Sequence, residues 1–254
     1  MIGHKEFEYH ADLGFVNGLK YALAFRVRRK VFDLFMREFR PTPESRVADL
    51  GVTANRSDRV HYFFEMLYPY PKSLTGIGRE DAYWYCEAFP GMTYINADLR
   101  AIPLPDRYFD YAICNAVVEH AGNRQSQARL VHEVCRVSKA VMVTTPNAGF
   151  PIDPHTFVPF AHWLPERAYR AVLRGLGLSQ FASIDVLNPL TGRDFIALFP
   201  SSRRNRLLHV GLPLARTNLV CISAVDDGVR GEGGLTACAG RAAWVHRSRV
   251  SRGR

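Results

Sequence analysis

The stretch Arg46-Val-Ala-Asp-Leu-Gly-Val-Thr-Ala-Asn55 decides the fold, because it joins a short apolar run to an acidic residue and a glycine turn. A strand that ends in this way is typical of an α/β sheet, in which ligands bind outside the carboxyl ends of the strands. Asp49 would lie at the strand end, where a carboxylate can accept hydrogen bonds, and Gly51 would let the backbone approach a ligand without a Cβ in the way. Only one glycine precedes the next helical pattern, so neither a G-x-G-x-x-G dinucleotide fingerprint nor a Walker phosphate loop is present.

Strand and helix patterns alternate after this stretch, which favours a doubly wound, parallel α/β sheet. The expected strands are Val47–Leu50, Leu74–Gly78, Thr93–Ala97, Tyr111–Ala116 and Val141–Thr145. The expected helices are Asp58–Tyr68, Glu80–Phe89, Gln125–Val137, Leu164–Leu176 and Asp194–Phe199. Two short apolar runs, Leu207–Val210 and Leu219–Ala224, predict a hairpin at one edge of the sheet.

The chain divides into three parts by composition. Residues 1–40 are expected to form a helical cap. Apolar residues in Phe15–Phe39 recur at helical spacing, which predicts one or two amphipathic helices, and Pro41 ends the pattern. Residues 41–226 carry the α/β domain. Residues 227–254 are rich in arginine and glycine and poor in large apolar residues, so we expect this tail to be disordered.

The composition also indicates in which cellular compartment the protein is expected. A chain of 254 residues with 47% hydrophobic content can bury a large core. The five cysteines are widely spaced and contain no C-x-x-C, which argues against a disulfide framework and a thiolate zinc site and favours a reducing environment. No apolar run reaches the roughly 18 residues of a membrane span. We therefore expect a cytoplasmic protein, whose oligomeric state the sequence leaves open.

The net charge of +9 is concentrated at the two ends of the chain. Residues 228–254 contain six arginines and one acid, and residues 15–40 contain seven basic residues and two acids. A basic tail can contact phosphates, so RNA or DNA binding is one hypothesis, and a basic amphipathic helix on an anionic membrane surface is another. Because the charge lies outside the α/β domain, we expect neither to be the main function.

Five short motifs follow one another along the α/β domain. They are Val47-Ala-Asp-Leu-Gly51, Asn96-Ala-Asp-Leu99, Pro103-Leu-Pro-Asp-Arg-Tyr-Phe-Asp110, Val117-Val-Glu-His120 and Glu133-Val-Cys-Arg-Val137. In this order they resemble the class I S-adenosylmethionine-dependent methyltransferases, in particular type 11-like domains. The resemblance covers residues 46–165, with weaker support to Ala224. It implies a Rossmann-like, mostly parallel seven-stranded sheet with helices on both faces and an antiparallel last strand.

The resemblance also implies S-adenosylmethionine as the cofactor. The residues that would bind it are Asp49, Gly51, Thr53, Gly78, Glu80, Asp81, Asp98, Leu99 and Asn115. Two departures from the family pattern concern this set. Thr53 and Asn55 stand where further glycines are usual, and Gly78 takes the place of the acid that binds the ribose hydroxyls. Glu80 or Asp81 would have to replace that acid.

Methyl transfer depends mainly on alignment, and it needs a base only when the acceptor must lose a proton. The Asn-Pro-Pro-Tyr motif of enzymes that methylate planar amines is replaced here by Asn115-Ala-Val-Val, which argues against nucleobase N-methylation. We therefore expect a small-molecule acceptor that is methylated at an oxygen or carbon atom. His120 and His155 are the candidate catalytic bases, although each could equally be a packing residue. Residues 146–165, rich in proline and aromatic side chains, are expected to form a lid or substrate loop.

Two further interpretations stay open at this stage. A metal site made of Asp153, His155 and His162 has no tight ligand spacing, so no metal is expected. The departures at Thr53, Asn55 and Gly78 also fit a non-catalytic module that kept the fold.

Overall fold

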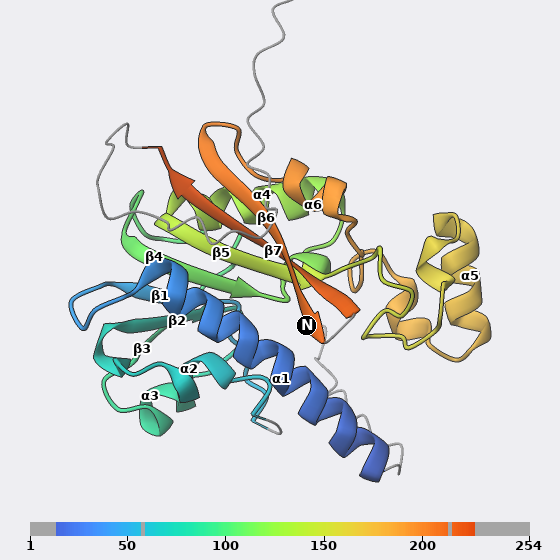
Figure 1. Cartoon of the computed structure of the whole chain (residues 1–254), viewed down its shortest axis with the longest axis horizontal. Helices are drawn as coiled ribbons and strands as arrows, with labels where there is room; N and C mark the ends of the chain where they lie inside the picture. The colour runs from blue at the N-terminus through green and yellow to red at the C-terminus, as the bar shows by residue number, and fades with distance from the viewer. Residues whose placement is uncertain (1–13, 57–58, 213–214, 227–254) are drawn as a thin grey trace, which may run out of the picture.

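A computed structural model describes residues 14–56, 59–212 and 215–226 of the chain, with side chains from Tyr21 onward. Seven strands form one sheet in the order β3-β2-β1-β4-β5-β7-β6 (Figure 1). The strands are β1 (Val47–Leu50), β2 (Leu74–Gly78), β3 (Thr93–Asn96), β4 (Phe109–Asn115), β5 (Ser138–Pro146), β6 (Arg203–Leu212) and β7 (Ala215–Val225). Strand β7 is antiparallel to both of its neighbours, and the other pairs are parallel, which confirms the predicted fold class.

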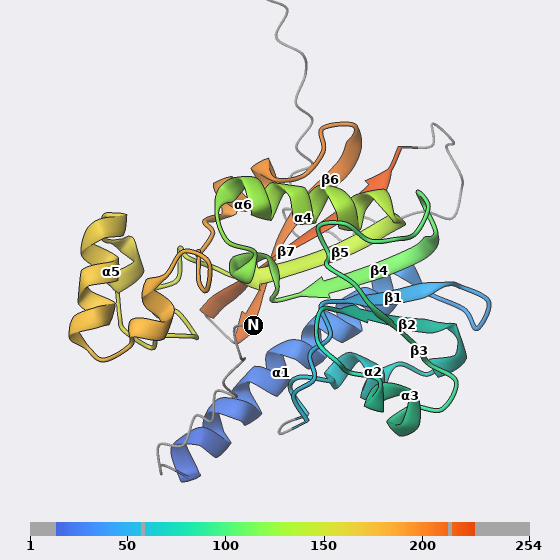
Figure 2. The ribbon, with the colours of Figure 1, turned by 180° about the vertical axis from the view of Figure 1, so that it is seen from behind.

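Helices cover both faces of the sheet (Figures 1 and 2). The helices on one face are α1 (Gly14–Phe39), α2 (Phe63–Leu67) and α3 (Trp84–Ala88), and those on the other are α4 (Arg124–Arg136) and α6 (Gly192–Ala197). The side chains of successive β1 residues pack on opposite faces of the sheet. Val47 packs with the first group, whereas Ala48 and Leu50 pack with the second, as expected from the twofold period of a strand.

Helix α1 is one continuous helix that crosses the sheet and is fastened to the edge strand β6. Its own residues Val31 and Phe35 are buried in the core between the helix and the sheet. Glu38 near its end forms a buried ion pair with Arg206 of β6, and the Lys30 ammonium donates a hydrogen bond of 2.7 Å to the carbonyl of Gly211. The cap expected over residues 1–40 is therefore tied to the sheet over its described part.

Helices α2 and α3 are shorter than the sequence pattern predicted. The expected spans 58–68 and 80–89 shrink to Phe63–Leu67 and Trp84–Ala88. The cause at α3 is tertiary hydrogen bonding. The Tyr94 hydroxyl and the Asn96 amide both donate to the carbonyl of Glu80, so residues after β2 stay extended instead of starting a helix.

The segment between β5 and α6 forms a lobe beside the sheet, at the right of Figure 1. It contains α5 (Glu166–Gly175) and a small core of its own around Ala161, Tyr169 and Leu173. Strands β6 and β7 are longer than the predicted runs and form the expected edge hairpin. None of the described helices has the length and apolar character needed to cross a bilayer. The Arg-rich tail at 227–254 lies outside the described residues.

Candidate functional site

The turn after β1 lies directly on the end of β2. The amides of Gly51 and Val52 donate to the carbonyl of Ile77, at 2.7 and 3.2 Å. A Cβ at position 78 would lie 2.2 Å from the carbonyl oxygen of Val52, so only glycine fits there. The loop and Gly78 are therefore matched to each other, which explains why the acid usual at this position is missing.

Glu80 lies two residues beyond the end of β2. Its Oε2 atom accepts hydrogen bonds from the Thr53 hydroxyl at 2.8 Å and from the Ala54 amide at 2.6 Å. These bonds hold the glycine-poor loop in place. Within the described residues nothing donates to the second oxygen, Oε1, and Asp81 makes no hydrogen bond or ion pair. Of the two carboxylates proposed for the ribose, Glu80 is the one that the fold positions.

Asp98, after β3, is held as an anion by two arginines. Arg100 binds its carboxylate with both the Nε and the Nη2 atoms, at 3.0 and 2.6 Å, and Arg79 lies 3.7 Å away. The hydrogen bonds from Arg100 lower the pKa of Asp98 to about 2. Leu99 beside it is buried. This arrangement gives a fixed, charged acceptor next to an apolar surface.

Asp49 faces a partner that the sequence did not indicate. Its carboxyl group is buried against that of Glu65 from α2, and neither oxygen of Glu65 has a well-formed hydrogen bond. Burial raises the pKa of Asp49 to about 7, against weaker opposing effects of Glu65 and Arg28. Burial and the neighbouring Asp49 raise the pKa of Glu65 well above its usual range. The two groups therefore form a carboxyl pair that retains protons near neutral pH.

The ends of β4 and β5 lie beside the turn after β1. Asn115 accepts a hydrogen bond of 2.7 Å from the Thr144 hydroxyl, and the chain then turns at Ala116, whose φ is 56°. The next residue, Val117, packs so closely on Gly51 that a Cβ there would lie 2.3 Å from its methyl group. Gly51 also has a φ of 113°, so two independent constraints require glycine.

Glu119, His120 and His155 come together beyond these strand ends. One potential ligand atom from each lies within 4.8 Å of the others. The two imidazole rings are edge-to-face, with centroids 4.8 Å apart. The sequence named both histidines, and the structure brings them together although they are far apart in the chain. Glu119 was not among the predicted site residues.

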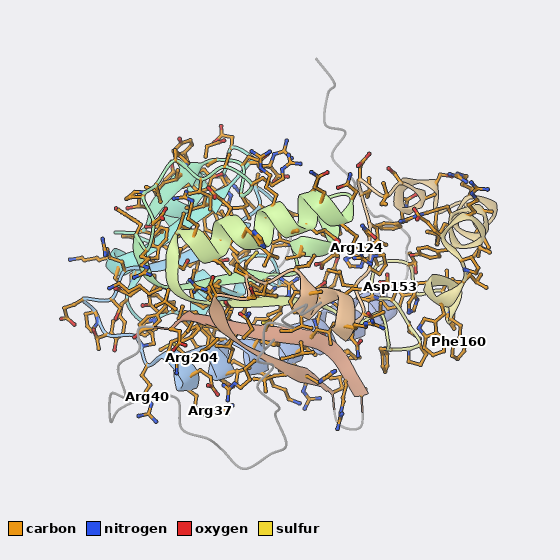
Figure 3. All side chains as sticks on the ribbon, turned by 90° about the horizontal axis from the view of Figure 1, so that it is seen from above. Arg37, Arg40, Arg124, Asp153, Phe160 and Arg204 are labelled. Carbon is orange, nitrogen blue, oxygen red and sulfur yellow. The ribbon has the colours of Figure 1, made fainter. Side chains whose placement is uncertain are left out.

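The loop at 146–165 is folded on itself. Asp153 accepts hydrogen bonds from two following amides, and His162 bonds the carbonyls of Ala148 and Phe150 through Nε2, so His162 has a packing role. Figure 3 shows Asp153 toward the body of the protein and Phe160 at the outer rim of the lobe. The exposed side chains of Phe157, Phe160 and Trp163 give the loop an apolar outer surface.

Comparisons with known proteins agree with this geometry. Residues 78–140, which span the ends of β2, β3 and β4, match the methyltransferase domain family. This segment of the chain is therefore similar to methyltransferase domains. The match supports an enzyme that uses S-adenosylmethionine, whereas the acceptor is not determined by it. A search of the curated proteins found no match to this chain.

Solved structures share the fold of this chain at low identity. The PH0226 protein from Pyrococcus horikoshii is 15% identical, with 80% of this chain and 91% of that chain covered and a TM-score of 0.52. Magnesium protoporphyrin IX methyltransferase from Synechocystis, solved with bound S-adenosylhomocysteine, is 11% identical, with 85% and 90% covered and a TM-score of 0.52.

Proposed function

We propose that this domain transfers a methyl group from S-adenosylmethionine to an oxygen or carbon atom of a small-molecule acceptor. The observation that carries the proposal is the pair of anchored carboxylates, Glu80 and Asp98, at the ends of β2 and β3 beside the turn at Gly51. Carboxylates at these positions accept hydrogen bonds from the ribose hydroxyls and the adenine amine.

The residues present fit this cofactor. Glu80 holds the loop through Oε2 and offers Oε1, to which no described residue donates, to a ribose hydroxyl. Asp98 stays ionised because Arg100 stabilises its charge. When bound, the cofactor supplies a methyl group already activated on a sulfonium, so the protein contributes mainly alignment and exclusion of water.

The departures from the family pattern are compensated within the fold, which favours catalysis over a non-catalytic module. Gly78 accommodates the carbonyl of Val52, and Glu80 provides the missing carboxylate. Thr53 adds a hydrogen bond that fixes the loop where further glycines are usual.

The acceptor would lie beyond β4 and β5, next to His120 and His155 and under the loop 146–165. We propose that the two histidines promote loss of the acceptor's proton. The absence of an Asn-Pro-Pro-Tyr motif after β4 favours oxygen or carbon over a planar amine nitrogen.

Calorimetric titration with S-adenosylhomocysteine tests the cofactor assignment. Glu80→Gln should weaken binding at least about tenfold, because an amide has one acceptor oxygen where the carboxylate has two. The control Asp81→Asn changes an exposed carboxylate in the next position and should bind like the unaltered protein. Equal affinities for Glu80→Gln and the unaltered protein would contradict the assignment.

A further inference from the structure

We infer that Glu119, His120 and His155 bind one divalent transition-metal cation at the acceptor end of the site. Their ligand atoms lie within 4.8 Å of one another. Donors about 2.1 Å from a tetrahedral cation are about 3.4 Å apart, so side-chain movements of about 1.5 Å close the site. Two imidazole nitrogens and one carboxylate oxygen suit zinc, iron, cobalt or manganese, and three protein ligands leave positions open for an acceptor.

Glu119 provides the observation that points to a ligand. The residue is 1% exposed. Its Oε2 atom accepts a hydrogen bond of 2.9 Å from the Thr145 hydroxyl, whereas Oε1 is buried without a partner. A buried carboxylate oxygen that lacks a donor is costly, and a cation bound there removes that cost.

Both histidines have an oxygen atom close to one ring nitrogen, as metal-binding histidines usually do. The Nδ1 atom of His120 lies 2.6 Å from the carbonyl oxygen of Val186, so Nδ1 carries the proton and Nε2 presents its lone pair. The Nδ1 atom of His155 lies 3.3 Å from the carboxylate of Asp153, which is itself held by backbone amides. A carbonyl or carboxylate behind the second nitrogen fixes the tautomer of a ligating imidazole and raises its basicity.

The position of the cluster suggests what the cation does, and this part of the inference rests on the proposed function. His120 ends the short helical turn Val118–His120 after β4, and His155 lies in the loop after β5. A cation there faces the acceptor side of the sheet edge. It would hold an acceptor hydroxyl or carboxyl oxygen and lower the pKa of a hydroxyl, so that the bound cation and not a free imidazole promotes loss of the proton.

Metal binding by the full chain, prepared without an affinity tag and stripped with a chelator, tests the inference. Titration with Co²⁺, followed by its visible absorption and by elemental analysis after dialysis, should show about one tightly bound equivalent. Glu119→Gln and His155→Asn should each weaken Co²⁺ binding at least about tenfold. His120→Asn changes an exposed side chain and provides a third variant that should fold normally. The control His132→Asn alters an exposed histidine on α4 and should bind Co²⁺ like the unaltered protein.

Parallel titration with S-adenosylhomocysteine separates the two proposals. Variants that lose Co²⁺ but keep the cofactor product are folded and support the metal site. A protein that binds Co²⁺ but does not bind S-adenosylhomocysteine would contradict the proposed function and would still support the metal site. Absence of bound Co²⁺ in the unaltered protein, or unchanged Co²⁺ affinity in Glu119→Gln and His120→Asn, would overturn the metal site.

Discussion

The buried pair of Asp49 and Glu65 makes the stability of this protein depend on pH in an unusual direction. Burial raises the pKa of Asp49 from its ordinary value of 3.8 to about 7, so the folded state binds a proton that the unfolded state releases. The free energy of unfolding therefore falls as the pH rises above about 4, and Glu65, whose pKa is also raised by burial and by Asp49, adds to this fall. About three pKa units correspond to about 4 kcal/mol in all, of which about 2 to 3 kcal/mol is lost between pH 5 and pH 8.

Asp49→Asn removes this titration while keeping the size of the side chain. The variant should gain about 2 to 3 kcal/mol relative to the unaltered protein between pH 5 and pH 8. Urea unfolding of both proteins without cofactor at the two pH values measures this difference. Groups away from the pair, such as Asp98, affect both proteins equally and cancel in the comparison. Loss of Asp49 also removes its effect on the pKa of Glu65, which changes the difference in the same direction. Asp81→Asn, at an exposed carboxylate, should follow the unaltered protein. Parallel stability curves for Asp49→Asn and the unaltered protein would refute the reasoning.

Three further predictions concern single contacts. Gly78→Ala should destabilise the protein by at least about 2 kcal/mol in urea unfolding, because its methyl group would meet the carbonyl of Val52 at 2.2 Å; an unchanged midpoint would show that the loop is free to move. Glu38→Gln should cost about 3 kcal/mol or more, because it leaves the buried Arg206 guanidinium without its anion, and a loss below about 1 kcal/mol would show that water reaches the pair. Thr145→Val removes the hydrogen bond to the Glu119 carboxylate, and should weaken Co²⁺ binding about 10- to 100-fold without changing affinity for S-adenosylhomocysteine; unchanged Co²⁺ affinity would argue against this supporting role.

The parallel core of the fold was predictable, because each strand from β1 to β5 is a short apolar run bounded by turn residues. The lengths of β6 and β7 were not predicted. Strand β6 begins with Arg203-Arg-Asn-Arg206, and Arg206 is buried and paired with Glu38 of α1. A pairing between positions so far apart leaves no local pattern.

The site was predicted only where its residues follow from local sequence patterns. Strand-terminal residues such as Asp98 and Asn115 follow from the position of the strands, and the structure places them at the common edge. The burial of Glu65 could not be predicted, since an acidic residue in a short helical pattern usually faces water, whereas here it lies buried beside Asp49. The grouping of His155 with Glu119 depends on how the loop after β5 folds back, which local sequence does not encode.

Binding of S-adenosylhomocysteine to the purified full chain tests the central claim most directly. Calorimetry should show one site per chain, with binding well below about 1 mM. No detectable heat of binding for either S-adenosylhomocysteine or S-adenosylmethionine at near-millimolar concentration would contradict the claim that this fold is a working methyltransferase.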